Sequence, residues 1–224
     1  MTAGRLAHGP LPQALRLPVL VTAGFGLCTV IVLGAALAGA SGPTVLDSWA
    51  RAHSGDPAQV RSAALTLDFA GEPVGAALLV LLLATVSVWL HRPVTAMVLF
   101  VAAGSTVAIT TALKHTVGRT IHDQPAFPSG HTGFLAAVAL VAGILITDVR
   151  GYERAVGTAV MLGTATATAA AMGWAQVALD AHYATDTVGG FATALAVVPG
   201  VVICADAVSR WSGAPAAAVP PAQK

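Results

Sequence analysis

Six long apolar runs dominate this sequence and decide what it can fold into. They cover residues 17–40, 74–90, 94–113, 132–146, 155–179 and 187–205. All but the fourth match the roughly 17 to 25 residues that a helix needs to cross a bilayer, and the fourth can borrow its start from the polar turn before it. Inside lipid, a helix satisfies its own backbone hydrogen bonds. The runs therefore predict an all-α protein, a six-span transmembrane helical bundle.

The composition supports insertion into a membrane. Hydrophobic residues make up 56% of the 224 positions, charged residues make up 9%, and the mean hydropathy is +0.78. These values lie far from those of a soluble domain. The net charge of +1 and the lack of a basic run of five or more residues argue against a nucleic-acid partner. Cys28 and Cys204 lie in apolar runs, where we expect small apolar side chains rather than a disulfide.

The polar segments divide the chain. They predict a cytoplasmic tail, a membrane domain and a disordered, Ala/Pro-rich cytoplasmic tail, at residues 1–16, 17–209 and 210–224. The one sizeable polar connection covers residues 41–73. In it, Asp56 and Pro57 form a good helix start, and apolar residues follow at helical spacing. This pattern predicts a short helix that lies on the membrane surface.

Positive residues set the expected orientation. With the N-terminus inside, seven Lys and Arg residues fall in cytoplasmic segments and four in outer ones, which agrees with the usual cytoplasmic excess. We therefore expect a plasma-membrane protein with both termini in the cytoplasm. The interfacial helix and two polar clusters, residues 114–131 and 180–186, then lie on the extracytoplasmic side, where the clusters can form one pocket.

The first cluster gathers ionisable residues in a chain that has few of them. It reads KHTVGRTIHDQPAFPSGH, and ionisable groups at the end of a membrane span indicate a functional site. Ser129 is expected to cap the following helix, and Gly130 lets an anion approach the backbone N–H groups. A Pro-Ser-Gly turn is also an ordinary loop-to-helix junction, so the turn alone does not decide between phosphate binding and a structural role.

The second cluster contains His182 and Asp186. Four residues apart, they can share one face of a helix. A carboxylate on one imidazole nitrogen fixes the tautomer that leaves the other nitrogen nucleophilic or basic. A buried structural pair would have the same spacing, but the location beside the membrane face that carries His131 favours catalysis.

Together these motifs resemble the type 2 phosphatidic acid phosphatase (lipid phosphate phosphatase) superfamily. A lysine, PSGH and His-x-x-x-Asp follow one another in a six-span chain, and the resemblance covers about residues 74–205. It implies that His182 attacks phosphorus to form a phosphohistidine, that Asp186 orients His182, and that His131 protonates the leaving oxygen. It also implies that three residues bind the phosphate oxygens: Lys114, Ser129 and Gly130, the last through its N–H.

The sequence departs from the family pattern at two arginines. The family has Arg-Pro seven residues after the lysine, where this chain has Ile121 and His122. It has Ser-Arg six residues before the nucleophile, where this chain has Ala175 and Gln176. A hydrogen bond to a charged group is worth roughly 1.5 to 3 kcal/mol. Losing the phosphate hydrogen bonds of both arginines without replacement would lower the reaction rate by several powers of ten.

Arg119 is the expected substitute for these arginines. On a continuous helix it would not share the face of Lys114, because five residues turn the helix by about 140°. Gly118, however, is a natural helix terminator, and from a loop Arg119 can fold back to the phosphate. The alternative is a structural or lipid-headgroup role for Arg119. For the neighbouring His115 we expect a structural role.

The sequence thus predicts an integral membrane phosphatase that hydrolyses a lipid phosphomonoester or diphosphate at the outer leaflet. We expect no cofactor and no metal, because the nucleophile is a side chain and no polar cluster offers a compact set of carboxylates. The alternative is a catalytically weakened relative that binds phosphorylated lipid as a transporter or scaffold. The spans disfavour a vanadate-dependent peroxidase, and the absence of ionisable residues within the spans disfavours a channel. The particular lipid and the oligomeric state stay open.

Overall fold

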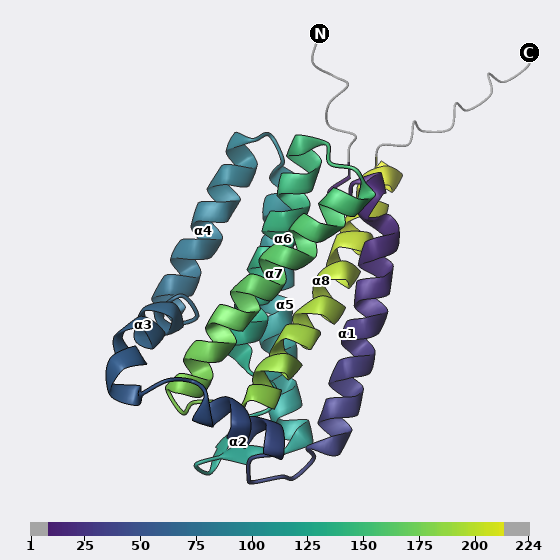
Figure 1. The fold of residues 1–224 in the computed structure, drawn as a ribbon. Helices are drawn as coiled ribbons and strands as arrows, with labels where there is room; N and C mark the ends of the chain where they lie inside the picture. The colour runs from purple at the N-terminus through teal and green to yellow at the C-terminus, as the bar shows by residue number, and fades with distance from the viewer. Residues whose placement is uncertain (1–8, 213–224) are drawn as a thin grey trace, which may run out of the picture.

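The computed structural model describes residues 9–212, which are mostly helical (Figure 1). The helices are α1 Arg16–Ala36, α2 Val45–Ala52, α3 Pro57–Phe69, α4 Pro73–Trp89, α5 Pro93–Val117, α6 Gly130–Arg150, α7 Arg154–Ala178 and α8 Ala184–Ser212. A short 3-10 helix, η1 Gln13–Leu15, precedes α1. The predicted all-α bundle is confirmed. A small antiparallel ribbon, β1 Thr120–Ile121 with β2 Gln124–Pro125, stands where the sequence predicts a loop.

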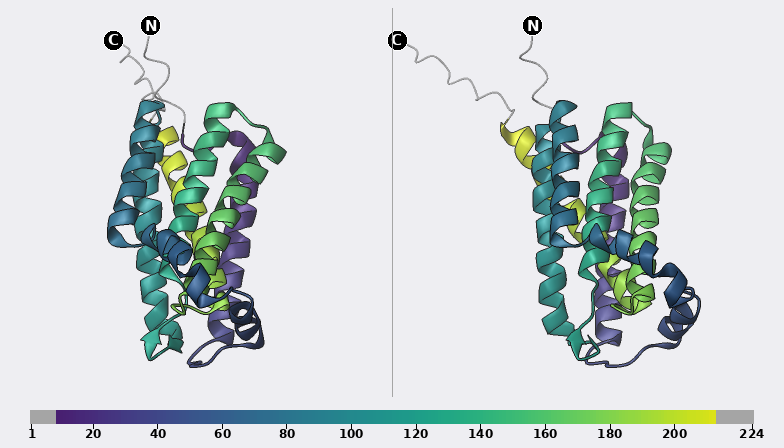
Figure 2. Two further views of the ribbon diagram at one scale, coloured as in Figure 1. Left: turned by 60° about the vertical axis from the view of Figure 1, so that its left-hand side comes forward. Right: turned by 90° about the vertical axis from the view of Figure 1, so that its left-hand side faces the viewer.

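The predicted membrane spans correspond to six of these helices. Within residues 9–212, five helices are long and apolar enough to cross a membrane: α1, α5, α6, α7 and α8. The remaining span, α4, passes the same test only together with α3, and a bend of 55° separates the two. Figure 2 shows α3 lying obliquely across the bundle while α4 runs alongside the other long helices.

The polar connection folds into two short helices rather than one. The predicted start of α3 is confirmed, because the Asp56 carboxylate accepts a hydrogen bond from the Ala58 N–H at 2.9 Å. The second helix, α2, was not predicted. It begins with a capping box, in which the Asp47 N–H donates to Thr44 Oγ1 at 3.2 Å and the Thr44 N–H donates to Asp47 Oδ2 at 2.8 Å. The Thr-x-x-Asp spacing in the sequence is typical of such a cap.

The two ends of the bundle differ. Both ends of the described chain lie at one end of the bundle, and α2 and the ribbon lie at the other (Figure 1). The two polar clusters therefore lie at the same end, as predicted. Helix α8 runs to Ser212, beyond the expected boundary at residue 209. Most of the two predicted tails, residues 1–8 and 213–224, falls outside the described residues, and the orientation across the bilayer stays a prediction.

Glycines allow the helices to pack closely. A Cβ atom at Gly26 of α1 would lie 2.6 Å from the Ala192 carbonyl oxygen and 2.7 Å from the Ala196 nitrogen, both on α8. At Gly143 of α6, a Cβ would lie 2.6 Å from the Met161 Cα on α7. Small residues let helix backbones approach in a membrane, where close packing replaces the hydrophobic driving force. The bundle that positions the site depends on these contacts.

Gly26→Ala is expected to lower the thermal unfolding midpoint of the detergent-solubilised protein. The added methyl group would overlap the α8 backbone, and such overpacking costs about 1 to 3 kcal/mol. Gly24 lies on the same helix with nothing within 4 Å of an added Cβ. Gly24→Ala should therefore keep or raise the midpoint, since alanine favours helix. Equal midpoints for the two variants, measured by circular dichroism, would contradict the close contact of α1 with α8.

Candidate active site

The Pro-Ser-Gly-His turn starts α6. As predicted, Ser129 is the N-cap residue, and its Oγ accepts a hydrogen bond from the Thr132 N–H at 3.4 Å. The Ser129 N–H donates to the Asp186 carbonyl oxygen at 2.9 Å. A Cβ at Gly190 would lie 2.2 Å from the Ser129 carbonyl oxygen. The turn is thus held directly against α8, and the N-terminus of α6 beside it suits an anion.

His182 lies in the short loop between α7 and α8. Its side chain is 8% exposed, and its Nδ1 lies 3.6 Å from Oδ2 of the fully buried Asp186. The same carboxylate oxygen accepts a hydrogen bond from the Tyr183 N–H at 3.0 Å, which fixes its position. Because Nδ1 faces the carboxylate, Nε2 is the ring nitrogen that can act on a substrate.

Burial lowers the pKa of His182 below its usual value of 6.5. Asp186 opposes this effect because its carboxylate stabilises the imidazolium, whereas the charges of Lys114 and His131 lower the pKa further. The imidazole is therefore mostly neutral at pH 7 and keeps the lone pair that a nucleophile needs. Of the predicted site residues, Asp186 on α8 contacts the His182 ring, and Lys114 on α5 and His131 on α6 are near enough for their charges to affect its pKa.

Arg119 is buried in a network of its own. Its Nη1 donates to Asp186 Oδ1 and to Thr185 Oγ1, both at 2.6 Å, and its Nη2 donates to Asp47 Oδ2 at 2.7 Å. Its guanidinium carbon also lies 4.4 Å from the centre of the Tyr183 ring. Protein groups therefore occupy the charged end of Arg119. Among the described residues, Nε of Arg119 has no hydrogen-bond partner, and phosphate binding by Arg119 stays a prediction.

The segment around Arg119 follows the sequence prediction in part. Gly118 ends α5 in the left-handed conformation, with φ of 67°, which confirms the predicted helix end. Ile121, at the position of the family arginine, is buried. His122 is exposed, and its Nε2 lies 3.1 Å from Asp180 Oδ2. Neither residue offers the cation that the family pattern has here.

Two carboxylates at the site were missed by sequence reasoning. His131 Nε2 lies 3.7 Å from Asp68 Oδ1 and 3.6 Å from Glu72 Oε1. Gln176, at the second family arginine position, donates to Asp68 Oδ1 at 2.6 Å. A Cβ at Gly71 would lie 2.2 Å from His131 Cδ2, so the turn between α3 and α4 rests on this ring. No spacing in the sequence links this turn with residue 131.

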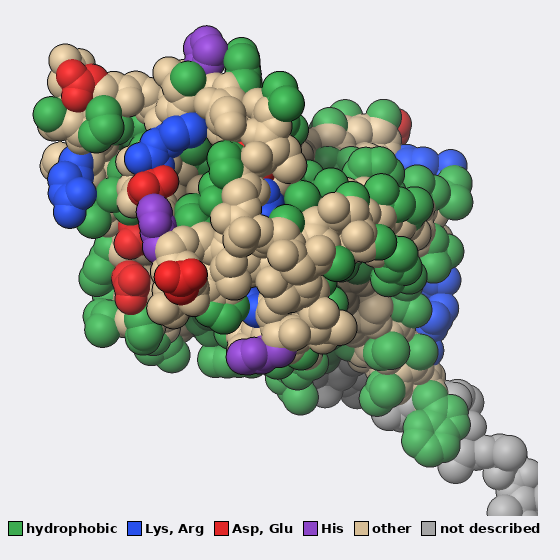
Figure 3. Space-filling model, turned by 90° about the horizontal axis from the view of Figure 1, so that it is seen from below, with side chains coloured by type: hydrophobic (Ala, Val, Ile, Leu, Met, Phe, Trp, Pro, Cys, Tyr) green, Lys and Arg blue, Asp and Glu red, His purple; other side chains and the backbone are tan. Residues whose placement is uncertain are grey.

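Asp68 and Glu72 make the surroundings of His131 more acidic than the sequence predicts. Asp68, Glu72 and His131 offer donor atoms that all lie within 4.8 Å of one another, a compact set that the sequence analysis did not anticipate. Figure 3 shows acidic side chains gathered along one side of the end opposite the termini, with a histidine among them. Carboxylates beside an anion site weaken the attraction for phosphate. The expected absence of a metal stays a prediction.

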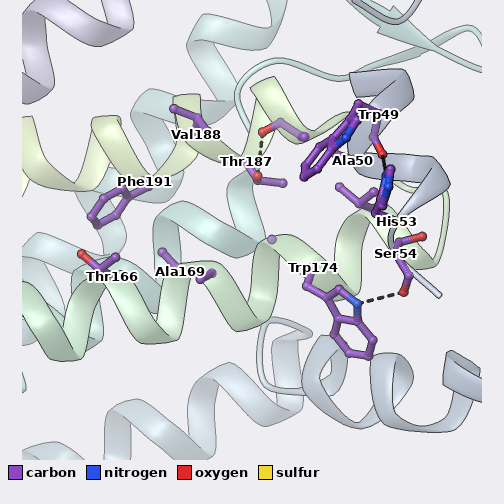
Figure 4. Close-up of a pocket in the computed structure, with 14 residues that line it drawn as sticks. Trp49, Ala50, His53, Ser54, Thr166, Ala169, Trp174, Thr187, Val188 and Phe191 are labelled. Atoms are coloured by element: carbon purple, nitrogen blue, oxygen red, sulfur yellow. Dashed lines mark hydrogen bonds between the residues drawn. The ribbon is translucent and has the colours of Figure 1, made fainter. Parts of the chain in front are cut away.

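An apolar cavity of about 410 Å³ lies between α2, α7 and α8 (Figure 4). Trp49 and His53 stack at one end, with ring centroids 4.5 Å apart. Trp174 on α7 lies at the same end, where its Nε1 donates to the Ser54 carbonyl oxygen at 3.0 Å. None of the predicted site residues lines this cavity. The cavity nevertheless reaches the first turn of α8, because Ala184 and Thr187, on either side of Thr185 and Asp186, line it.

Comparisons with known proteins agree with this arrangement. The PAP2 superfamily model matches residues 95–210, more than half of the chain. The chain belongs to the PAP2 superfamily. The predicted family is thus confirmed. The match begins at residue 95, so Asp47 on α2, Asp68 on α3 and Glu72 before α4 lie outside the matched segment.

A solved PAP2 structure has the same fold. The chain is similar to a transmembrane PAP2-type phosphatidylglycerolphosphate phosphatase from Bacillus subtilis, with 18% sequence identity and a TM-score of 0.63. The alignment covers 82% of this chain and 94% of the other. A search of curated protein sequences found no match. The structural likeness supports the six-span architecture, and at this identity it speaks for the fold alone.

NMR titration of the histidine side chains can test the charges around His182. We expect a pKa below 6.5, because burial disfavours the imidazolium. Lys114→Met should raise this pKa by removing a repelling charge, whereas Asp186→Asn should lower it by removing an attracting one. The His182→Gln spectrum assigns the signal. Shifts of the opposite sign would contradict the arrangement of these charges.

Proposed function

We propose that this PAP2 protein hydrolyses a lipid phosphomonoester or diphosphate through a phosphohistidine intermediate. The observation that carries the proposal is the buried His182–Asp186 pair, which the hydrogen bond from Ser129 joins to the anion-binding turn. A neutral imidazole held by a carboxylate, beside a helix N-terminus, combines a nucleophile with a phosphate site. The PAP2 membrane fold supports a lipid phosphatase.

The proposed reaction has two steps. In the first, His182 Nε2 forms a bond to phosphorus, the bond to the leaving oxygen breaks, and His131 gives that oxygen a proton. Asp186 stabilises the positive charge that develops on the attacking ring. In the second step, water attacks phosphorus and gives a proton to His131, the P–N bond breaks, and inorganic phosphate leaves. This mechanism needs a side-chain nucleophile and a general acid, and the site offers both.

The phosphate oxygens need positive charge and hydrogen-bond donors in the transition state. Lys114, Ser129 Oγ and the Gly130 N–H are the proposed donors, from the end of α5 and the start of α6. The lysine supplies the formal charge, since Arg119 is paired with carboxylates. We assign this end of the bundle to the extracytoplasmic side of the plasma membrane, because the other connections carry more Lys and Arg.

A second candidate function is supported by a specific observation. Gln176 stands where the family has an arginine, and it donates to Asp68. Together with the engaged Arg119, this leaves fewer cations for phosphate than the family pattern has. A catalytically weakened relative that binds phosphorylated lipid as a transporter or scaffold would fit this arrangement.

His182→Ala is expected to abolish phosphate release by the detergent-solubilised protein from a panel of phosphatidate, phosphatidylglycerophosphate and polyprenyl diphosphate. His131→Ala should reduce the release at least about 100-fold, the lower range for a lost general acid. His115→Ala is the matched control, because His115 is an exposed neighbour of the site, and it should keep full activity. Unchanged release in both active-site variants would exclude the mechanism. Lipid binding by the wild type without turnover would favour the second candidate.

The proposed hydrolysis does not need a divalent cation. Phosphate release should therefore proceed at the same rate in EDTA as with added magnesium, because a side chain supplies the nucleophile. The comparison is made on one preparation, dialysed and divided. A loss of activity in EDTA that magnesium restores would contradict this expectation and direct attention to Asp68, Glu72 and His131.

A further inference from the structure

Asp47 on α2 is a buried carboxylate that the proposed reaction does not use directly. Its Oδ1 accepts hydrogen bonds from Thr185 N–H at 2.8 Å and from Thr185 Oγ1 at 2.9 Å. Its Oδ2 accepts from Arg119 Nη2 at 2.7 Å and from the Thr44 N–H at 2.8 Å. Burial alone would raise the pKa of Asp47, but these hydrogen bonds lower it overall. Asp47 is therefore ionised, and it touches the residue that precedes Asp186.

Arg119 connects this carboxylate with the active site. Its two terminal nitrogens contact Asp47 on one side and Asp186 on the other, and the three side chains are completely buried. Asp186 in turn faces His182 Nδ1 at 3.6 Å. A continuous series of contacts thus runs from Asp47 on α2 through Arg119 and Asp186 to the proposed nucleophile.

The formal charges of Asp47, Arg119 and Asp186 give a reason for the second carboxylate. Without Asp47, Arg119 and Asp186 would form a pair with no net charge, and such a pair stabilises an imidazolium poorly. With Asp47, the three buried groups carry a net formal charge of −1. In a poorly hydrated site, one unit of charge has a large effect on a neighbouring ionisable ring. Asp47 lets Arg119 hold Asp186 in place without cancelling its charge.

Helix α2 is firmly placed to do this. Arg51 Nη1 donates to the Val177 carbonyl oxygen at 3.0 Å and pairs with Asp180 in the loop that carries His182. At the end of α2, the Ser54 carbonyl oxygen accepts the hydrogen bond from Trp174 on α7 (Figure 4). The helix therefore attaches to the end of α7, the loop and the start of α8. Its position fixes Asp47 relative to the site.

We propose that Asp47 is a positioning residue of the active site, which holds Arg119 and Thr185 so that Asp186 stays oriented and negatively charged beside His182. The inference rests on the proposed function for its kinetic consequences. The arrangement itself depends only on buried contacts. Asp47 lies before residue 95, outside the segment that matches the family model.

Other charged groups around His182 must be considered before its pH dependence is interpreted. Lys114 faces it from α5, His131 from α6 and Asp186 from α8. From α7, the backbone carbonyl oxygen of Gln176 accepts a hydrogen bond from the backbone N–H of His182. This carbonyl group is neutral. A substitution at Asp47 changes none of these residues, so its effect on His182 passes through Arg119 and Asp186.

The test compares Asp47→Asn with the double variant Asp47→Asn/Arg119→Gln. Asp47→Asn brings the net charge of the three groups to zero, which should lower the pKa of His182. The neutral imidazole is the reactive form, so activity falls as pH drops through this pKa. The acid limb of kcat/KM should therefore move to lower pH. The double variant restores a net charge of −1 and should move the limb back toward its wild-type position.

The kinetic constants provide a second readout. Asp47→Asn should lower kcat by about 10- to 100-fold, by analogy with carboxylates that orient metal-binding histidines. KM should change less than about threefold, because Asp47 has no place in the proposed phosphate site. Asp56→Asn is the matched control, since Asp56 caps α3 from an exposed position and asparagine caps equally well. It should leave kcat and the pH profile unchanged.

NMR titration of His182 separates this inference from the proposed function, because it needs no turnover. A fall in the His182 pKa in Asp47→Asn, reversed in the double variant, supports the positioning role even if no lipid is hydrolysed. An unchanged pKa and acid limb in Asp47→Asn would overturn it. So would a double variant that is shifted as far as the single one. If Asp47→Asn fails to fold, the double variant is measured instead. Its acid limb of kcat/KM and its His182 pKa should then be close to those of the wild type.

Discussion

The buried pairing of Arg119 with two carboxylates is the interaction on which this end of the bundle depends. It joins the end of α5, the short helix α2 and the first turn of α8 at one point. Buried charges are costly unless they are paired and hydrogen-bonded, and removal of one partner leaves the others uncompensated. The three elements must therefore assemble together. The same contact that closes the bundle also fixes the carboxylate beside His182.

The proposed active site uses the ends of helices rather than their middles. Lys114 comes from the last turn of α5, Ser129 caps α6, and His182 lies just before α8. The apolar spans hold these ends in register while the polar groups stay near the interface, where ionisable residues are less costly than at mid-bilayer. The last turn of α3 adds Asp68 from the side, and the residue before α4 adds Glu72. The pocket thus combines residues of the segment that matches the family with acidic groups that precede it.

Local signals in the sequence were enough for the fold and for the helix ends that carry the candidate site residues. Apolar runs predicted the spans, the Ser129 cap followed from its turn, and Gly118 ended its helix as expected. The partners of Arg119 could not be predicted, because Asp47 lies 72 positions away and reaches it only through the packing of α2 on α8. For the same reason, nothing in the sequence linked Asp68 to His131. Short-range patterns reveal helices and caps, whereas pairings between distant buried charges require the assembled structure.

The backbone contact between the Pro-Ser-Gly-His turn and α8 has a consequence for the proposed reaction. Ser129 donates to the Asp186 carbonyl oxygen, and the absence of a side chain at Gly190 lets the two backbones lie close together. These contacts fix the turn against α8. A phosphate site built in this way would be preorganised, so that little of the binding free energy is spent on rearranging the protein. The proposed lipid substrate would then make the adjustment, because its headgroup would have to leave the plane of its neighbours to reach the turn.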